Sequence, residues 1–361
     1  MPPSASPPPF NIPTGGQTLA LLPVLSEAID RVQREFEQAL RSDLPPVQRL
    51  VEHLENYRGK MLRPALVILS GLAATPPLAE SSTSPSHITI AAAIEMIHMA
   101  TLVHDDVLDE ADIRRKGATV NRLRGNEAAV ILGDYLFSSA FRLCSSLNSQ
   151  AAALLIGQTG MTLCAGELLQ LHHRENFSID EPTYFEIVRR KTGSLIAVAC
   201  RLGAMQSGPG RGDGVGAVGA STDDIPARME RVGMDLGVAF QIQDDLLDLT
   251  GNQSVVGKPL RRDLELGKLT LPVIHHLATA TPEQRGRTLA LLDTPHTEPG
   301  TSAAVSRALL EALETTRSIQ HARDEAARLV ARAKANLAAL PETPARELLM
   351  VMADQVVTRT S

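Results

Sequence analysis

The chain has 361 residues, which is long enough to bury a sizeable core in one large domain or two ordinary ones. Its 35 basic and 41 acidic residues leave a net charge of −6, and no long basic run occurs, which argues against a nucleic-acid-binding surface. Cys144, Cys164 and Cys200 stand far apart in the sequence. We therefore expect reduced core cysteines rather than a disulfide framework or a zinc knuckle.

The first 18 residues are rich in proline and carry no charged side chain, and we expect a disordered segment there. The segment lacks the basic start of a signal peptide and the arginines of a transit peptide. No apolar run is long enough to span a bilayer. The sequence therefore predicts a cytoplasmic protein with a single domain over residues 19–361.

The remainder is predicted to be almost entirely helical, because apolar residues recur three and four positions apart and alternating β-branched residues are scarce. The expected helices are residues 25–40, 50–57, 63–72, 87–110, 126–147, 151–171, 183–204, 228–249, 271–280 and 302–340, the last with breaks that the pattern does not place. Proline, serine and glycine mark connectors at 75–85, 207–222 and 293–300. We interpret 207–222 as a flexible insertion, since no Gly-Lys-Ser/Thr follows to make it a phosphate-binding loop.

Two aspartate clusters of identical spacing lie within apolar helical stretches: Asp105-Asp106-x-x-Asp109 and Asp244-Asp245-x-x-Asp248. Residues four apart share a helix face, and like charges at that spacing destabilise a helix unless cations neutralise them. Magnesium suits such a set, because it binds carboxylates together with substrate phosphate oxygens. We predict a magnesium–diphosphate clamp in which the two clusters face each other, with a solvated acidic face as the plainer alternative.

Basic residues that could bind further diphosphate groups are placed near both clusters. Arginine offers a planar fork to phosphate oxygens and lysine a compact charge. The plainer alternative is that each basic candidate is simply exposed to solvent and that His98 is a histidine of the core. The candidates are Lys60, Arg63, His98, Arg114 and Arg115 around the first cluster, and Lys191, Thr192, Lys258 and Lys268 around the second.

Taken together, these motifs resemble the trans-isoprenyl diphosphate synthases of the polyprenyl synthetase family over roughly residues 20–361. The order and number of the motifs make the resemblance specific. Arg58 departs from it, since the family usually has a second glycine before Gly59. The matching motifs are Gly59-Lys60-x-x-Arg63-Pro64, Glu95-x-x-His98, His104-Asp105-Asp106-x-x-Asp109, Arg114-Arg115, Gly133-Asp134, Gly166-Glu167-x-x-Gln170, Lys191-Thr192 and Phe240-Gln241-x-x-Asp244-Asp245-x-x-Asp248.

The resemblance implies an all-α antiparallel helical bundle around a central cavity, of the isoprenoid synthase type, assembled as a homodimer. It implies a magnesium-dependent prenyltransferase, with manganese as a substitute, that condenses isopentenyl diphosphate with an allylic diphosphate primer. The implied isopentenyl diphosphate ligands are Lys60, Arg63, His98 and Arg115. The implied allylic diphosphate ligands are Arg114, Lys191, Thr192, Gln241, Lys258 and Lys268. The implied metal ligands are Asp105, Asp109 and Asp244, supported by Asp106, Asp245 and Asp248. The implied catalytic residues are Asp105, Asp109, Lys191, Asp244 and Lys258.

Product length is expected to depend on side-chain size near Ala100 and Thr101, one turn before the first cluster. Related short-chain enzymes carry an aromatic ring at one of these positions, so the small residues here predict a long-chain product. The growing chain is expected to run down a tunnel into the helical bundle beneath the first cluster. Phe137 or Phe141 could instead close that tunnel and give a farnesyl or geranylgeranyl product. A terpene cyclase and a non-catalytic subunit of a heteromeric synthase are the other hypotheses. A long apolar product would imply transient membrane contact at release.

Overall fold

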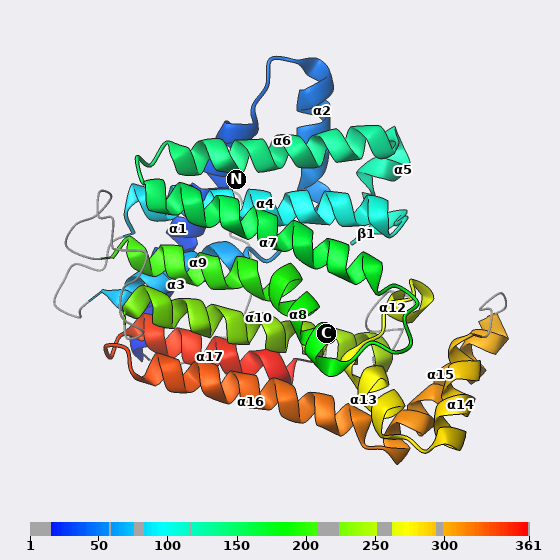
Figure 1. Cartoon of the computed structure of the whole chain (residues 1–361). Coiled ribbons are helices and arrows are strands. Elements are labelled where there is room, and N and C mark those ends of the chain that lie inside the picture. Colours follow the sequence, from blue (N-terminus) through cyan, green and yellow to red (C-terminus); the bar gives the residue numbers. More distant parts are fainter. Residues whose placement is uncertain are drawn as a thin grey trace. The chain divides into compact units, whose positions relative to one another are not determined.

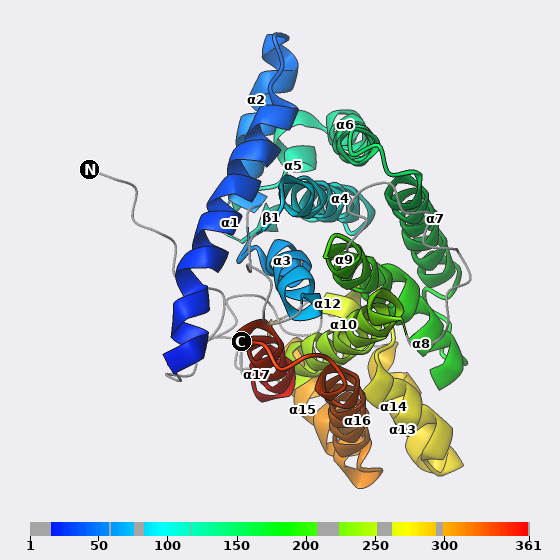
Figure 2. The ribbon, with the colours of Figure 1, turned by 90° about the vertical axis from the view of Figure 1, so that its left-hand side faces the viewer.

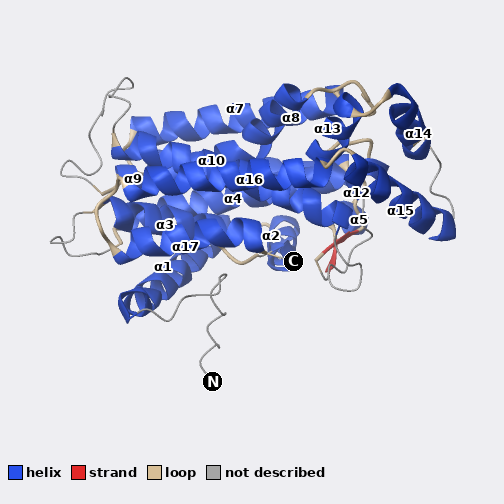
Figure 3. Ribbon diagram, turned by 90° about the horizontal axis from the view of Figure 1, so that it is seen from below, coloured by secondary structure: helices blue, strands red, loops and turns tan. Residues whose placement is uncertain are grey.

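The computed structural model describes residues 16–57, 59–75, 83–115, 117–207, 224–250, 262–293 and 299–359. Helices make up most of this part of the chain, and its only strands, β1 (Ile113–Arg114) and β2 (Gly117–Ala118), form a short antiparallel hairpin (Figure 3). The all-α prediction is therefore confirmed. The expected flexible insertion and most of the proline-rich segment lie outside the described residues, although α1 already begins at Gly16.

The helices follow the predicted order closely (Figure 1). They are α1 (Gly16–Leu40), α2 (Pro45–His53), the 3₁₀ helix η1 (Leu54–Tyr57), α3 (Leu62–Ala74), α4 (Pro85–Leu108), α5 (Val120–Arg124), α6 (Asn126–Ser145), α7 (Gln150–His172), α8 (Glu181–Val188), the π-helix η2 (Arg189–Gly193), α9 (Ser194–Met205), α10 (Ile225–Thr250), α12 (Arg262–Glu265), α13 (Leu271–Thr279), α14 (Pro282–Leu292), α15 (Pro299–Thr315), α16 (Ser318–Ala338) and α17 (Pro344–Thr358).

The chain packs into two compact units, each assembled from three separate stretches of sequence. The first unit comprises residues 1–161, 195–233 and 335–352, and the second comprises 162–194, 234–334 and 353–361. Neither unit can be cut out as a continuous piece, because the chain passes repeatedly from one to the other. The first aspartate cluster belongs to the first unit and the second cluster to the second unit.

Helix α4 forms the centre of the first unit, packed against α1, α3 and α6 (Figure 2). Ser84 caps its N-terminus, where Pro85 occupies the first turn and the Ser84 side chain accepts a hydrogen bond from the His87 backbone N–H. Most side chains between His87 and Val103 are buried, so this helix is held by packing on all sides. The buried length of α4 therefore fixes where the aspartates at its C-terminal end lie in this unit.

The second unit has a core of its own around α13. Its buried cluster consists of Leu249, Val273, Leu277, Leu309 and Leu313. These residues join the end of α10 to α13 and α15, and α13 also packs against α8 and α14. Pro272 occupies the first turn of α13, where its missing N–H costs no helical hydrogen bond. This core supports the helices that carry the second set of motifs.

Two helices are long and apolar enough to cross a membrane by length and composition alone, contrary to the expectation that no such run exists. They are α4 and α7. Of the apolar window, 78% is buried in α4 and 28% in α7. A buried core helix passes the same test, so this is weak evidence for a span.

Candidate functional site

The first aspartate cluster lies at the C-terminal end of α4. Asp105 and Asp109 are half-buried, and the backbone N–H of Asp109 donates to the Asp105 carbonyl at 2.8 Å, so the two residues stand one turn apart as predicted. Asp106 is buried, and its carboxylate is bonded to Arg114. Its Oδ1 accepts hydrogen bonds from Arg114 Nε at 2.8 Å and Arg114 Nη2 at 2.7 Å. Asp106 therefore anchors the β1–β2 hairpin to α4.

Arginines of the first unit gather around His98. Burial, followed by the charges of Arg63, Arg114 and Arg115, holds the pKa of His98 well below its usual value. Burial raises the pKa of nearby Glu95, and the charges of Arg63 and Arg115 oppose that shift. Three guanidinium groups around one neutral imidazole repel each other, and a bound polyanion would relieve that repulsion.

Gly59 brings the loop containing Lys60 against this arginine cluster. A Cβ on Gly59 would lie 2.6 Å from Nη2 of Arg115, so only glycine lets the guanidinium lie against the loop backbone. Arg115 itself has a positive φ of 56° at the hairpin turn. Lys60 is exposed beside it. The structure thus brings Arg63, His98 and Arg115 together, with exposed Lys60 next to Gly59 in the chain, while Arg114 is bonded to Asp106. Arg58 lies outside the described residues.

The Gly133-Asp134 motif has a packing role in the first unit. His104 Nε2 lies 3.1 Å from the Val130 carbonyl oxygen, and its ring stacks on Phe137. A Cβ on Gly133 would lie 2.0 Å from that nitrogen. Gly133 is therefore required for α6 to approach α4 just before the aspartates.

In the second unit, Lys191 and Thr192 lie in the π-helix η2 between α8 and α9. Such π-turns occur often at functional sites. Lys191 Nζ lies 2.5 Å from Glu167 Oε2 and donates to Gln170 Oε1 at 2.8 Å. The Gly166-Glu167-x-x-Gln170 motif on α7 therefore holds this lysine. Gly166 allows the contact, since a Cβ there would lie 2.9 Å from the Lys191 backbone nitrogen.

A chain of hydrogen bonds connects η2 to the second aspartate cluster on α10. Thr192 Oγ1 donates to Gln241 Oε1 at 2.9 Å, and Gln241 Nε2 donates to Asp245 Oδ1 at 2.9 Å. Tyr184 Oη donates to the other Asp245 oxygen at 2.6 Å. Burial and the Asp263 charge raise the pKa of Asp245 well above its usual value, and burial raises the pKa of Tyr184. Asp245 is thus a buried positioning group, and Tyr184 is a member of the site that the motifs did not identify.

Arg359, near the C-terminus, is the other unanticipated residue. Its Nη2 forms an ion pair with Asp244 Oδ1 and donates to the Phe240 carbonyl at 3.0 Å, while the guanidinium lies 3.8 Å from the Phe240 ring centroid. No sequence motif marks an arginine so far along the chain from its partner. Lys268 is half-buried, and its backbone N–H donates to the Asp263 carbonyl at 2.8 Å. Lys258 lies outside the described residues.

Both clusters offer the donor chemistry that a hard divalent cation requires. Asp105 and Asp109 supply half-buried carboxylates from consecutive turns, and Asp244 already neutralises its charge with the cationic Arg359. The first cluster therefore fits such an ion as it stands, whereas in the second a metal ion would have to displace Arg359 from Asp244. Because the clusters lie in different units, their convergence on shared ions stays a prediction.

An all-α fold that carries two aspartate-rich helices, each in a unit that also carries basic motifs, is typical of a class of prenyl-transferring enzymes. Residues 45–309 match the family model described as Polyprenyl synthetase. The chain belongs to the polyprenyl synthetase family.

Known relatives and solved structures resemble nearly the whole chain. It is 33% identical to heptaprenyl diphosphate synthase component 2 of Geobacillus stearothermophilus over 92% of this chain and 96% of that protein. It is also 33% identical to the octaprenyl diphosphate synthase of Escherichia coli over 89% and 93%. A polyprenyl synthase from Caulobacter crescentus, solved with calcium and isoprenyl diphosphate, superposes with a TM-score of 0.80 at 29% identity, covering 97% of this chain and 100% of that one. Synthases named for shorter products match as well.

These findings confirm the predicted family, fold and enzyme class: the chain is a prenyltransferase that joins isopentenyl diphosphate to an allylic diphosphate. The family assignment favours chain elongation over cyclisation. The roles of individual residues, the identity of the metal and the product length belong to the proposal below.

Proposed function

We propose that this prenyltransferase is a magnesium-dependent, long-chain trans-polyprenyl diphosphate synthase acting in the cytoplasm as a homodimer. The observation that carries the proposal is that each unit holds one acidic cluster linked to the basic motifs. In the first unit Asp106 binds Arg114, one of the arginines around His98. In the second, hydrogen bonds through Gln241 connect Asp245 to Thr192, the neighbour of Lys191. Because both sets are intact, a non-catalytic subunit is the weaker hypothesis.

In the proposed mechanism, Asp105 and Asp109 of the first unit and Asp244 of the second would hold magnesium, which would supply the Lewis-acid charge that favours loss of diphosphate from the allylic substrate. Lys191, Thr192, Gln241, Lys258 and Lys268 bind that diphosphate and orient its carbon–oxygen bond. Asp106, Asp245 and Asp248 support the ligands.

The second substrate is proposed to bind at Lys60, Arg63, His98 and Arg115. These groups fix the diphosphate of isopentenyl diphosphate, so that its double bond attacks the allylic cation after the carbon–oxygen bond breaks. A new carbon–carbon bond forms, and the proton is lost to the released diphosphate. Neutral His98 can donate a hydrogen bond without adding to the charge of the arginines. Arg114, held by Asp106, positions the hairpin that presents Arg115.

The reaction is tested by replacing Asp105 and Asp244 with Asn, one at a time, and measuring condensation of isopentenyl diphosphate with farnesyl and geranylgeranyl diphosphate. Loss of an electrostatic stabiliser of the leaving group is expected to lower kcat by at least about 100-fold. Asp324→Asn, an exposed change on α16 outside every motif, serves as the control. Full activity of both cluster variants would contradict the proposal, and product from an allylic diphosphate alone would favour the cyclase.

Long products are proposed because Ala100 and Thr101, one turn before the first cluster on α4, have small side chains. Ala100 is fully buried on α4, and Thr101 is half-buried with its hydroxyl bonded to the His98 carbonyl at 2.8 Å. Ala100→Phe is expected to shorten the products seen by mass spectrometry by several isoprene units, since one helical turn of about 5.4 Å is similar to one extended unit.

Phe137 and Phe141 provide the comparison. Phe137 is half-buried against His104, whereas Phe141 is 51% exposed. Phe137→Ala tests whether that ring closes the tunnel instead, and Phe141→Ala is the matched surface change. Longer products from Phe137→Ala with unchanged products from an active Ala100→Phe would assign the tunnel floor to α6.

Self-association is proposed because α6 and the first half of α7 expose large apolar side chains in the first unit. The most exposed are Val130, Ile131, Phe141, Leu154 and Met161, with 42% to 75% of each accessible. Contiguous apolar surface of this kind marks interfaces. A second copy of the chain is the proposed partner, with a heteromeric partner as the alternative.

A further inference from the structure

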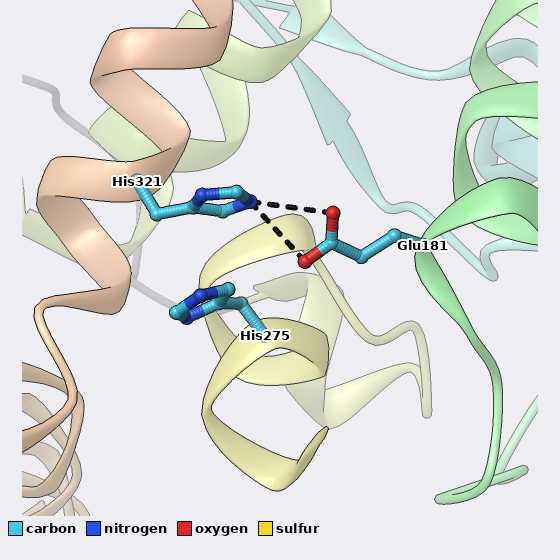
Figure 4. Close-up of side chains that lie close together, drawn as sticks. All are labelled: Glu181, His275 and His321. Atoms are coloured by element: carbon cyan, nitrogen blue, oxygen red, sulfur yellow. Dashed lines mark hydrogen bonds and ion pairs between the residues drawn. The ribbon is translucent and has the colours of Figure 1, made fainter. Parts of the chain in front are cut away.

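A cluster of two histidines and a glutamate lies in the second unit, apart from the residues assigned to the reaction (Figure 4). Glu181 begins α8, His275 belongs to α13, and His321 belongs to α16. His321 Nε2 lies 3.2 Å from both carboxylate oxygens of Glu181. The His275 ring stacks on the His321 ring with 4.0 Å between centroids. Three helices thus bring one possible ligand each into this cluster.

The spacing of the ligand atoms suits a small divalent cation. One possible ligand atom from each residue lies within 4.8 Å of the other two. Tetrahedral zinc with bonds of about 2.0–2.2 Å separates its ligands by about 3.4 Å. The His321–Glu181 pair, at 3.2 Å, is close to that separation, and a tilt of the His275 ring that keeps Nδ1 at Ser318 brings Nε2 the remaining distance. All three side chains are half-buried, so an ion can enter from solvent while the site stays enclosed by its helices.

A buried polar network orients His275 from behind. Its Nδ1 lies 2.9 Å from Ser318 Oγ, and Ser318 Oγ lies 2.7 Å from Thr316 Oγ1, which in turn lies 2.8 Å from His276 Nδ1. Ser318 and His276 are fully buried. Metal-binding histidines in proteins are commonly held in this way, with one ring nitrogen fixed by a neighbour and the other presented to the metal.

The charge state of the cluster also suits a metal. Burial and the neighbouring His321 lower the pKa of His275, and a neutral imidazole is the form that coordinates. When both rings are neutral, the carboxylate of Glu181 is the one charged ligand, and the three ligands together present a charge of −1 to a divalent ion. Two nitrogens and one carboxylate favour zinc over magnesium or calcium, which prefer oxygen ligands alone.

We propose that Glu181, His275 and His321 form a second divalent-metal site of the zinc class, distinct from the aspartate clusters, that ties α8 to α13 and α16. The three side chains leave a fourth position for water. Because α8 continues directly into η2, a metal here stabilises the base of the segment that carries Lys191. The site is structural and contributes no group to the prenyl transfer.

The test uses the full-length chain carrying Asp105→Asn and Asp244→Asn, so that zinc bound at the aspartate clusters does not obscure the result. After treatment with a chelator and gel filtration, the protein is titrated with ZnCl₂, and bound zinc is counted by mass spectrometry. One equivalent is expected. His321→Gln or His275→Gln should abolish it, while His172→Gln, a histidine elsewhere in the same unit, should leave it unchanged.

His321→Lys separates a metal site from a simple ion pair, since lysine keeps a positive charge opposite Glu181 but does not coordinate zinc at neutral pH. Zinc at a hundredfold excess over Kd is expected to raise Tm of the parent by about 4 °C and to leave Tm of His321→Lys unchanged. In an otherwise wild-type background, magnesium-dependent activity and helical circular dichroism verify that each variant folds. Zinc stoichiometry that is insensitive to both histidine substitutions, or equal Tm shifts in parent and His321→Lys, would overturn the proposal.

Discussion

Arg359 shows how a single residue can act on a metal ligand from the far end of the sequence. Its ion pair with Asp244 neutralises a carboxylate that the family resemblance assigns to magnesium, and its aliphatic stem and guanidinium are fixed over Phe240. The arginine and the metal ion therefore compete for the same oxygen. A partly exposed ion pair of this type contributes up to about 1 kcal/mol.

Replacing Arg359 with Gln is expected to lower the magnesium concentration for half-maximal activity by about two- to fivefold, because the ion no longer has to displace the guanidinium. The measurement is a magnesium titration of the condensation rate. Arg332→Gln is the matched control, since Arg332 makes an equivalent ion pair with Asp235, an aspartate on the same helix outside the motif. A raised magnesium requirement in Arg359→Gln would mean that the arginine supports metal binding instead of opposing it.

Sequence patterns predicted most of the residues assigned to these sites. They did so only where the spacing of charged residues along a helix is itself unusual. The aspartates, Lys60, Arg63 and Lys191 were found because charges at helical spacing or at a helix entry are unusual in an apolar context. Tyr184 and Arg359 were missed because their partners are distant in the sequence. Tyr184 contacts Asp245, 61 residues away, and Arg359 contacts Asp244, 115 residues away, and local sequence patterns do not predict such contacts.

At the scale of the element, the helices that were predicted well have long apolar repeats, and most of those that were missed are short or polar. The exception is α17, which the prediction omitted although it has 15 residues and buries Leu348 and Leu349. α5 and α12 span only 5 and 4 residues, too few for a period to emerge. α14 has few buried residues, although Thr281 and Gln284 form a capping box and Pro282 occupies its first turn, a pattern that could have revealed it. The predicted helix 183–204 proved to be α8, η2 and α9, since apolar period does not distinguish a π-turn from the helix around it.

The contact between α7 and η2 depends on Gly166, which gives a test at this scale. Gly166→Ala should force α7 away from η2, because its Cβ would meet both the Arg190 Cβ at 2.7 Å and the Lys191 backbone. Overpacking of this kind costs about 1–3 kcal/mol in the free energy of unfolding, and displacement of Lys191 should lower kcat as well.

Gly157→Ala on the same helix is the control, since nothing lies within 4 Å of its Cβ position. It should stabilise α7 by up to about 1 kcal/mol through helix propensity. Chemical denaturation and steady-state kinetics on both variants make the comparison. Equal effects of the two substitutions would show that α7 and η2 adjust without strain.

At the scale of the whole molecule, the exposed apolar side chains of α6 and α7 predict the oligomeric state. Charged substitutions in the proposed interface, Ile131→Glu with Met161→Glu, should convert a dimer into a monomer, as measured by light scattering on a gel-filtration column. Leu44→Glu, at a site 59% exposed before α2, should leave the mass unchanged. A wild-type mass of one chain would refute the homodimer.

The alternation of segments between the two units has a consequence for synthesis on the ribosome. The first unit lacks part of its structure until residues 335–352 have been made, and the second until 353–361 have been made. Contacts between such distant segments slow folding, because long loops must close before the contacts form. Each unit therefore completes its packing only when its last stretch joins the earlier ones, and until then the exposed apolar helices are the surfaces that chaperones would protect.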